Sequence, residues 1–304
     1  MAPANQRSGH GEVVPVPLGG DERMDCARCG EKVAAHLPAC QVCGAHAGYP
    51  NVRAAQMPQE LLGLDLRYDD AKAAAAATGC ESVLNDFEAA LGQSFAVLVR
   101  SLDQVLTLAK SDNALMATFA LMVAGGARLP EDNEFDRARQ AVDALMFPSY
   151  HPEIRFASLS LDGRGAGANY GAYTMVLREA HIELRASAFE ENSFEFCRRH
   201  GQQVTQPIPR GYRADWPGRR RLAVAKLAGR IKPDVTEDDF PAILVEEDPV
   251  SNGVEFVEIH IYGPISRRNI EKVIGPQPVR KDDRVLVSSL QRLLKEVGAG
   301  LELR

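Results

Sequence analysis

The spacing of apolar residues changes near residue 150 and divides the chain into two parts. From residue 68 to 147, apolar side chains recur at helical intervals, most clearly in "SFAVLVRSLDQVLTLAK". After Pro152 the period becomes two, which predicts strands. The expected strands cover residues 154–161, 172–178, 182–189, 242–247 and 254–262. Helices first and strands afterwards predict an α+β fold, with a helical segment at 67–150 and a mixed-sheet domain at 151–304.

In the last of these strands, "VEFVEIHIY", the alternation places the polar side chains on one face and aliphatic side chains on the other. Three aliphatic residues form its inner face: Val257, Ile259 and Ile261. Glu258, His260 and Tyr262 form the opposite face, which Val254 and Phe256 are expected to share. A face that mixes an acid, an imidazole and large apolar groups favours a cleft over an open surface. A solvated strand face is the simpler alternative.

Two helices are expected within and after the strand region. Residues 210–232 predict a helix with a basic flank, in which Asp215 is the single acid. A solvated face, a face paired with the acids at 237–239 and 246–248, and a phosphate-binding surface all fit this charge pattern. Residues 288–298 predict an amphipathic helix that ends at Gly298.

Four cysteines form a C-x2-C…C-x2-C array, the most specific motif in the chain: Cys26, Cys29, Cys40 and Cys43. Gly30 and Gly44 follow the two pairs, as tight metal-binding knuckles require. The array predicts a zinc ribbon at 25–46 with four sulfur ligands. Because four ligands leave no open position, the zinc is expected to be structural. Docking of a protein partner is favoured over nucleic-acid binding, since only Arg28 and Lys32 supply positive charge inside the array.

Composition and the remaining segments narrow the choice of function. A net charge of −6 argues against a general nucleic-acid or membrane binder, and no apolar run is long enough to cross a bilayer. Residues 1–24 are expected to be a flexible lead without the apolar core of a secretory signal, and 47–66 a linker; a cytoplasmic protein is expected. Cys80 and Cys197 are expected to be small buried side chains.

Common nucleotide and hydrolase motifs are absent from the sequence. It has no G-x-G-x-x-G after a strand, no P-loop, no G-x-S-x-G and no H-E-x-x-H. The glycine-rich stretch "GRGAGANYGA", residues 163–172, predicts a flexible hairpin loop between two strands, or a loop whose amides approach a phosphate.

Two stretches resemble an uncharacterised bacterial domain family related to ADP-ribosyltransferases. They are "FVEIHIYGPI" and "EIRFASLSL…ANYGAYTMVLREAHIELRASAFEENS", and the resemblance covers residues 153–275. The family's His-Phe-His-Pro-Asp-Arg stretch has no counterpart here beyond "YHPEIRF". The resemblance implies an NAD+ site in which Glu258 is catalytic, supported by Ser187 and His260. It also implies that NAD+ is bound by Arg155, Tyr170 and Tyr262.

The resemblance therefore implies an NAD-dependent ADP-ribosyltransferase or NAD glycohydrolase of the toxin or defence type, acting on a protein or nucleic acid. Zinc would be structural and NAD+ a co-substrate. The alternative is a non-enzymatic adaptor whose zinc ribbon binds a protein partner or nucleic acid. A third hypothesis is a hydrolase that uses Glu258 and His260 with an additional metal.

Overall fold

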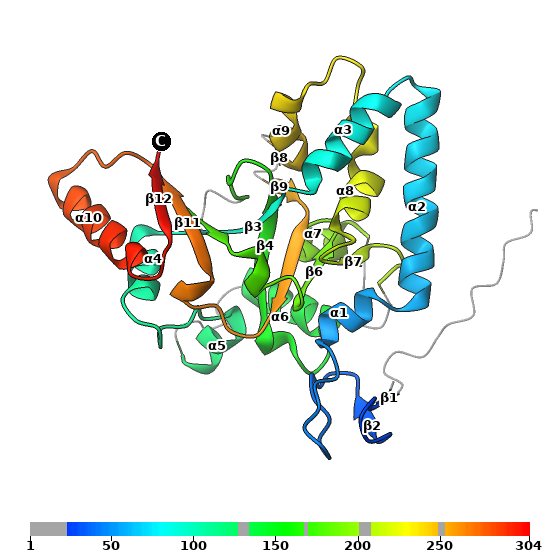
Figure 1. Ribbon diagram of the computed structural model, residues 1–304, viewed down its shortest axis with the longest axis horizontal. Helices are drawn as coiled ribbons and strands as arrows, with labels where there is room; N and C mark the ends of the chain where they lie inside the picture. Colours follow the sequence, from blue (N-terminus) through cyan, green and yellow to red (C-terminus); the bar gives the residue numbers. More distant parts are fainter. Residues whose placement is uncertain (1–22, 127–133, 167–169, 201–207, 249–252) are drawn as a thin grey trace, which may run out of the picture.

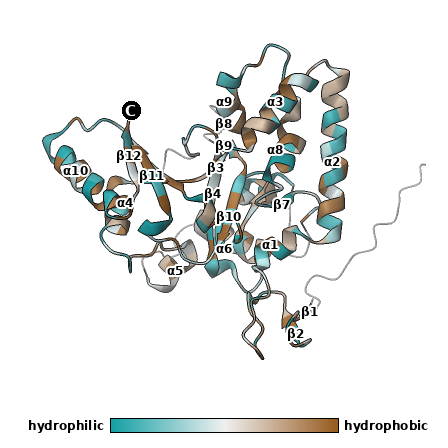
Figure 2. Ribbon diagram, viewed as in Figure 1, coloured by the Kyte–Doolittle hydropathy of each residue, from teal (hydrophilic) through white to brown (hydrophobic). Residues whose placement is uncertain are grey.

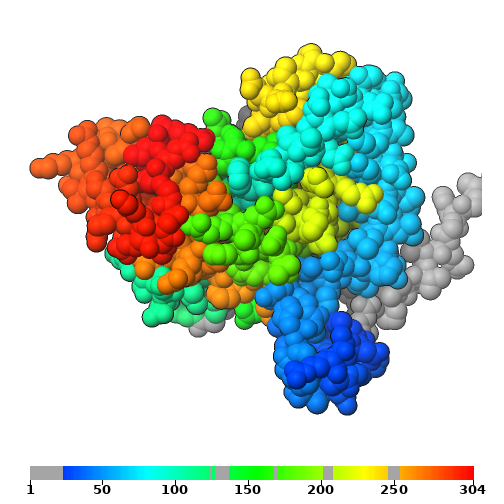
Figure 3. Space-filling view, viewed as in Figure 1, coloured from blue at the N-terminus to red at the C-terminus, as the bar shows by residue number. Residues whose placement is uncertain are grey.

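The expected α+β class is confirmed by a computed structural model of the chain (Figure 1). The structure describes residues 23–126, 134–166, 170–200, 208–248 and 253–304. Most of the expected flexible lead, residues 1–22, lies outside the described residues. A small cysteine-bearing ribbon precedes a large mixed sheet that is flanked by helices, and Figure 3 shows the ribbon protruding from the body as a separate lobe.

An eight-stranded sheet forms the centre of the described molecule, with the order β12-β11-β5-β3-β4-β10-β6-β7. Neighbouring strands are antiparallel except β11 and β12, which are parallel. Its strands are β3 (Phe95–Arg100), β4 (Ile154–Ser160), β5 (Tyr173–Leu177), β6 (Ala186–Phe189), β7 (Arg213–Asp215), β10 (Glu258–Tyr262), β11 (Ile270–Gly275) and β12 (Gly300–Leu303). Strand β10, which carries the Glu-x-His pair, lies between β4 and β6.

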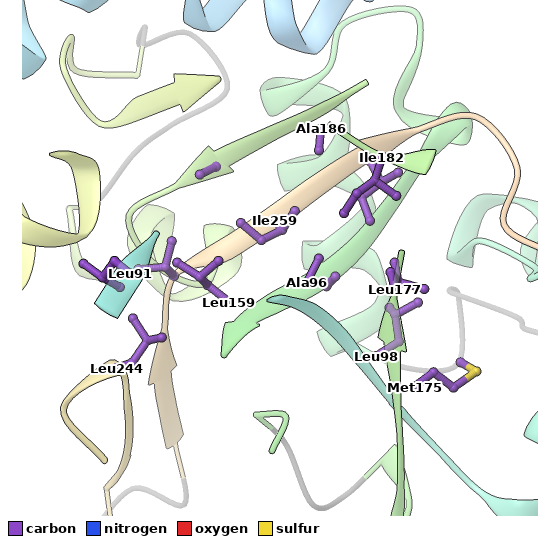
Figure 4. Close-up of a cluster of buried hydrophobic side chains, with 14 of the residues drawn as sticks. Leu91, Ala96, Leu98, Leu159, Met175, Leu177, Ile182, Ala186, Leu244 and Ile259 are labelled. Carbon is purple, nitrogen blue, oxygen red and sulfur yellow. The ribbon is translucent and has the colours of Figure 1, made fainter. Parts of the chain in front are cut away.

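One face of the sheet packs against a broad aliphatic core. Ile259 of β10 is fully buried there beside Leu159 of β4 and Ala186 of β6 (Figure 4). In Figure 2 hydrophobic colour recurs through the central sheet, whereas α10 carries hydrophilic colour along much of its length. The helices that contribute to this core are α2 (Pro58–Ala77), α3 (Glu81–Leu91), α4 (Leu102–Ala109), α8 (Arg219–Leu227), α9 (Phe240–Leu244) and α10 (Lys281–Lys295).

The opposite face of β4, β6 and β10 packs against a second cluster, which we call the aromatic core: Met146, Phe147, Tyr150, Ile154, Phe189, Phe196, Cys197 and Ile208. Helices α6 (Glu134–Met146) and α7 (Ser193–Arg199) supply its outer side chains. The candidate chemistry of β10 therefore lies under packed helices rather than on an open face of the sheet.

The remaining elements connect these layers. They are β1 (Arg23–Asp25), β2 (Lys32–Ala34), α1 (Pro50–Ala55), α5 (Phe119–Ala124), β8 (Val245–Asp248) and β9 (Gly253–Phe256), with the 3-10 turns η2 (His151–Glu153), η4 (Glu179–His181), η5 (Ala228–Arg230), η6 (Glu237–Asp239) and η7 (Arg267–Asn269). No described helix combines the length and the hydropathy that a membrane crossing requires.

The prediction of a helix across residues 95–109 was wrong for its first six residues, which form β3. The four central residues of β3, 96–99, are all buried, so this strand is covered on both faces and its apolar run carries no period of two. Helix α4 starts directly afterwards, because Ser101 and Gln104 form a capping box over its first turn.

Other predicted boundaries also shift. Helices α1 and α2 occupy much of the expected linker at 47–66. The strand expected at 182–189 begins only at Ala186, after a turn, and the strand expected at 242–247 is the end of α9 followed by β8. The strand expected at 254–262 breaks at Val257: β9 pairs with β8, whereas β10 joins the central sheet. Val254 and Phe256 therefore do not extend the face of Glu258.

The glycine-rich loop after β4 is not a hairpin, because β3 lies between β4 and β5 in the sheet. The loop instead crosses the sheet. A Cβ at Gly163 would lie 2.5 Å from Ile274 Cδ1, and one at Gly165 would lie 2.3 Å from Val99 Cγ2. These two glycines permit close packing against apolar side chains, which accounts for them without a phosphate.

The basic segment at 210–232 is largely paired within the fold. It forms β7 and α8 rather than one helix. Arg210 contacts Glu60 at 3.1 Å, and Arg221 contacts Asp65 at 2.7 Å. Buried Arg219 donates to carbonyl oxygens of Trp216 and Gly92. These partners are not the downstream acids that the sequence suggested, and they leave little of the segment for phosphate binding.

Candidate metal centre and buried carboxylate site

The four cysteines of the ribbon converge on one point. Their Sγ atoms all lie within 4.8 Å of one another, with Cys26 3.6 Å from Cys43 and Cys29 3.7 Å from Cys40. Each pair sits on a tight turn that ends at a glycine with positive φ, +74° at Gly30 and +69° at Gly44. The two knuckles therefore aim four sulfur atoms at a common centre.

The donor set fits a tetrahedral metal ion such as Zn2+. The backbone amides of Arg28 and Cys29 point at Cys26 and lower its pKa to about 6. The amide of Glu31 favours the thiolate of Cys29, but burial and the neighbouring thiols outweigh it and raise the pKa of Cys29 to about 12. Because clustered thiolates oppose one another's ionisation, a cation is needed to hold all four as ligands. Among the described residues these four alone gather as a metal-ligand set.

Arg53 of α1 fastens the ribbon to the rest of the chain. Its guanidinium donates to the carbonyl oxygens of Ala35 at 2.6 Å, Leu37 at 3.1 Å and Ala47 at 2.9 Å, and also to that of Gly48. One side chain thus satisfies carbonyls from both sides of the second knuckle. The orientation of the ribbon is fixed by this contact rather than left to a linker.

Asn51, on the same helix, connects α1 to the sheet. It is buried, and its Nδ2 lies 3.1 Å from the carbonyl oxygen of Arg185, 3.0 Å from that of His260 and 3.1 Å from Ser187 Oγ. Helix α1 therefore contacts the ribbon through Arg53 and strands β6 and β10 through Asn51. The two candidate sites are joined by one short helix.

Glu258 and His260 form a buried pair on β10. The two side chains are only 2% and 3% exposed, and His260 Nε2 lies 2.8 Å from Glu258 Oε2. The same carboxylate oxygen accepts a hydrogen bond from the backbone amide of Ser193 at 3.1 Å. Asn192 caps α7 and points this amide toward the sheet, since its Oδ1 accepts from the next two amides.

The protonation states of this pair follow from its contacts. Burial raises the pKa of Glu258, but the hydrogen bond from His260, the charge of Arg139 and the amide of Ser193 outweigh burial and hold it below its usual range. Burial lowers the pKa of His260 despite the neighbouring carboxylate. At neutral pH the pair is therefore an ionised carboxylate and a neutral imidazole, which donates its Nε2 proton.

Three phenylalanine rings enclose the imidazole of His260. Phe147 lies 4.7 Å away between ring centroids, Phe156 5.4 Å and Phe189 6.0 Å. Edge-to-face contacts with Phe147 and Phe156 fix the ring plane, so His260 has one orientation toward Glu258. This enclosure supports a rigid carboxylate rather than a mobile acid–base group.

Two residues of α6 extend the polar cluster outward. Arg139 Nη2 lies 3.9 Å from Glu258 Oε1, and Arg139 Nε lies 2.9 Å from Asp143 Oδ1. Burial raises the pKa of Asp143 to about 6, because it outweighs the attraction of Arg139 and Glu258 adds repulsion. Two carboxylates thus share one guanidinium, and their pKa values shift in opposite directions.

A cavity of about 280 Å³ opens beside Asp143, between α5, α6 and η2. Its lining residues are Ala120, Leu121, Val123, Gln140, Asp143, His151 and Pro152. Arg139 contacts both Asp143, which lines this cavity, and Glu258, so it connects the cavity to the buried carboxylate.

The structure brings together some of the residues that the sequence suggested. Ser187 lies directly opposite His260 in the β6–β10 register and shares its face. Tyr170 is 63% exposed and lies near Arg139. Burial lowers the pKa of Arg139, but Asp143, Glu258 and Tyr170 together outweigh burial and raise it. Tyr262 is half-buried, with its ring 5.4 Å from Tyr49.

Arg155 does not join them. It lies opposite Ile261 in the β4–β10 register, so its Cα–Cβ bond points to the face away from Glu258 and His260. Its Nη1 donates to the carbonyl oxygen of Glu153 at 2.8 Å. The expected convergence of Arg155, Ser187 and Glu258 on one cleft is therefore absent from the fold.

Four residues of the site were not singled out from the sequence: Asn51, Arg53, Arg139 and Asp143. The first two lie in the region expected to be a linker. Arg139 and Asp143 are spaced i,i+4, a spacing that signals a helical ion pair but gives no indication that the pair faces a buried carboxylate.

Comparison of the chain with protein-family models found no match, and comparison with curated proteins found none either.

Proposed function

We propose that the chain is an enzyme that cleaves or transfers at a glycosidic bond, with NAD+ as the substrate that the resemblance of residues 153–275 implies. One observation carries the proposal: Glu258 is a buried carboxylate held in place by His260, Ser193 and Arg139. A fixed carboxylate stabilises the positive charge that develops on a ribose as its bond to a cationic ring breaks.

In this proposal the bond between ribose C1′ and the nicotinamide nitrogen breaks, and nicotinamide leaves with the bonding electrons. Water, or a hydroxyl or amine of a target, forms the new bond to C1′ and loses its proton to solvent. Glu258 is the group proposed to stabilise the developing charge, and His260 holds the carboxylate in position as a neutral donor. Ser187, which lies on the same face as His260, is proposed as the ribose contact.

The polar cluster also suggests the direction of approach. Glu258 is covered by the aromatic core on the α7 side, whereas Arg139 leads from it to the cavity and to exposed Tyr170. Arg139, rather than Arg155, is then the cation nearest the reacting carboxylate, and a substrate phosphate is a suitable partner for it. This assignment departs from the roles implied for Arg155 by the resemblance.

The test is release of nicotinamide from NAD+ by the full-length, zinc-loaded protein. Glu258→Gln keeps the size and a hydrogen-bond acceptor but removes the charge, so we expect at least a ~100-fold slower release with an unchanged fold. Glu183→Gln, at an exposed position, is the matched control and keeps the wild-type rate. Wild-type release by the Glu258→Gln protein contradicts the catalytic role.

A second candidate is a zinc-ribbon adaptor, favoured by the rigid attachment of the ribbon. Arg53 fixes its orientation, and Met24 and Val42 stand exposed on it, at 38% and 72%. Exposed apolar side chains on a fixed lobe suit contact with a protein surface better than with nucleic acid. Most basic residues of segment 210–232 are already paired, which lowers the case for nucleic acid.

The adaptor candidate is tested by placing a photocrosslinking amino acid at position 42 and irradiating cells that express the protein. We expect a discrete crosslinked protein that disappears when Cys40 is replaced by serine, with none from the same probe at position 183. Equal crosslinking from both positions, or none from position 42, counts against it. Absence of NAD+ turnover together with a zinc-dependent crosslink would favour the adaptor over the enzyme.

A further inference from the structure

Helix α1 is too short to keep its conformation alone. It has six residues, Pro50–Ala55, and its N-cap residue Tyr49 makes no side-chain capping hydrogen bond. An isolated helix of this length is not stable in water, so α1 is held by what its side chains contact. Those contacts lie on two sides, because α1 is placed between the ribbon and the central sheet (Figure 1).

The contacts on the ribbon side depend on the metal. The four carbonyl oxygens that Arg53 binds belong to residues 35–48, which surround the second knuckle. The ring of His46 lies in the same stretch, 4.7 Å from the ring of Tyr49. A ribbon of this size folds only around its metal ion. Loss of zinc therefore removes the ribbon-side partners of both Arg53 and Tyr49.

The contacts on the sheet side are made by Asn51. Its Nδ2 lies 3.0 Å from the carbonyl oxygen of His260, 3.1 Å from that of Arg185 and 3.1 Å from Ser187 Oγ. Backbone carbonyls only accept hydrogen bonds, so the NH2 end of the amide faces the strands. Asn51, Ser187 and His260 are 3%, 4% and 3% exposed. Because all three are buried, water does not replace a lost Asn51 donor while the strands stay packed.

We propose that Asn51 is a positioning residue for Ser187 and His260, and that zinc in the ribbon holds it in place through α1. With zinc bound, Arg53 and Tyr49 keep α1 docked and Asn51 donates to the site. Without zinc, α1 loses its ribbon contacts, and Asn51 releases the hydroxyl of Ser187 and the carbonyl of His260. The catalytic consequence rests on the proposed function, whereas the coupling between the metal and β10 does not.

The coupling is reciprocal, which gives it a magnitude. If zinc favours the docked α1, removal of the Asn51 contacts weakens zinc binding by the same factor, typically about 5- to 150-fold. Asn51→Leu keeps the size of the side chain but loses the amide, so we expect it to bind zinc at least about fivefold more weakly. Asn113→Leu, at an exposed position, is the matched control and binds zinc as the wild type does.

Nuclear magnetic resonance of the full-length protein tests the coupling without NAD+. With carbon-13 at histidine carbonyls and nitrogen-15 at isoleucine amides, only the pairs His181–Ile182 and His260–Ile261 give signals. His181→Gln, at an exposed position, identifies the signal of His260. Because the carbonyl shift reports the hydrogen bonds that its oxygen accepts, a chelator should move the His260 signal of the wild type. In zinc-loaded Asn51→Leu the signal should already be displaced, and chelation should move it no further.

A His260 signal that stays in place when the wild type loses zinc overturns the proposal. A zinc-dependent movement that persists in Asn51→Leu overturns it as well, as does wild-type zinc affinity in that variant. Arg53→Met provides a check if Asn51→Leu disturbs the fold. Its zinc-loaded signal should be displaced toward the zinc-free position, and a signal at the zinc-loaded wild-type position contradicts the route through Arg53. Failure of nicotinamide release with the zinc-dependent signal retained refutes only the proposed function.

Discussion

Replacement of Arg53 by methionine removes the contact that fastens the ribbon to the body. Methionine keeps an unbranched apolar stem but no donor. The carbonyl oxygens of Ala35, Leu37, Ala47 and Gly48 lose their shared guanidinium. We expect the ribbon to lose its fixed orientation and to bind zinc more weakly, because its second knuckle is no longer held in the metal-binding geometry.

The magnitude follows from the contacts. A hydrogen bond to a charged group contributes about 1.5–3 kcal/mol to stability, but half-exposed carbonyls regain water when the donor is lost. Contacts that share one side chain also do not add fully. We therefore expect a total loss of about 2–4 kcal/mol, which corresponds to a roughly 30- to 900-fold weaker affinity for zinc if the loss falls on the metal-bound state.

Competition with a chromophoric zinc chelator measures this affinity, and hydrogen exchange of the ribbon amides measures its local stability. Arg53→Lys should fall between Arg53→Met and wild type, since one ammonium cannot reach all four carbonyls. Arg198→Met is the matched control, an exposed arginine that pairs with Glu195 of its own helix, and should change stability by less than about 0.5 kcal/mol. If Arg53→Met binds zinc as tightly as the wild type does, Arg53 does not hold the ribbon in its metal-binding geometry.

Three further predictions concern the buried site and the metal. His260→Phe leaves Glu258 buried without its imidazole and should cost about 3–5 kcal/mol in urea unfolding, whereas His260→Gln should cost less; equal losses would show that the pairing is unimportant. The pKa of Asp143, raised in the folded state to about 6 from 3.8, makes its ionisation destabilising, so stability should fall by about 3 kcal/mol as pH rises from about 4 to 6, and Asp143→Asn should remove that component of the pH profile. Removal of zinc by a chelator, or Cys40→Ser, should raise hydrogen exchange in the ribbon and α1 while the central strands stay protected; cooperative unfolding of the whole chain would contradict a local structural metal.

The sequence predicted the fold class and the metal ligands because both depend on local information. The two C-x2-C knuckles place their sulfurs through turns of a few residues, and the alternation around β10 separates Glu258 and His260 from Ile259 without knowledge of the neighbouring strands. The burial of Ile259 in the aliphatic core follows the same pattern.

Segments with two buried faces were predicted less well. The run 95–99 is apolar throughout because both faces of β3 are buried, and such a run is compatible with a helix or a strand. Helix α1 was missed because its six residues are too few to show a period, and its role depends on distant partners of Asn51 and Arg53.

The error at Arg155 has a simpler origin. Arg155 pairs with Ile261 in the β4–β10 register, three positions along β10 from Glu258, so the period of two puts it on the opposite face; the sequence alone does not give this register. Arg139 and Asp143 were unpredictable for another reason. Their helix packs on β10 across more than 100 residues of sequence, a contact that only the tertiary structure supplies.

The rate of nicotinamide release from NAD+, compared between wild type and Glu258→Gln, tests the central claim most directly. The account predicts measurable release by the zinc-loaded wild-type protein and a rate at least about 100-fold lower in Glu258→Gln, with the two proteins unfolding at similar urea concentrations. Equal rates in the two proteins, or no release by the wild type, would contradict a catalytic Glu258.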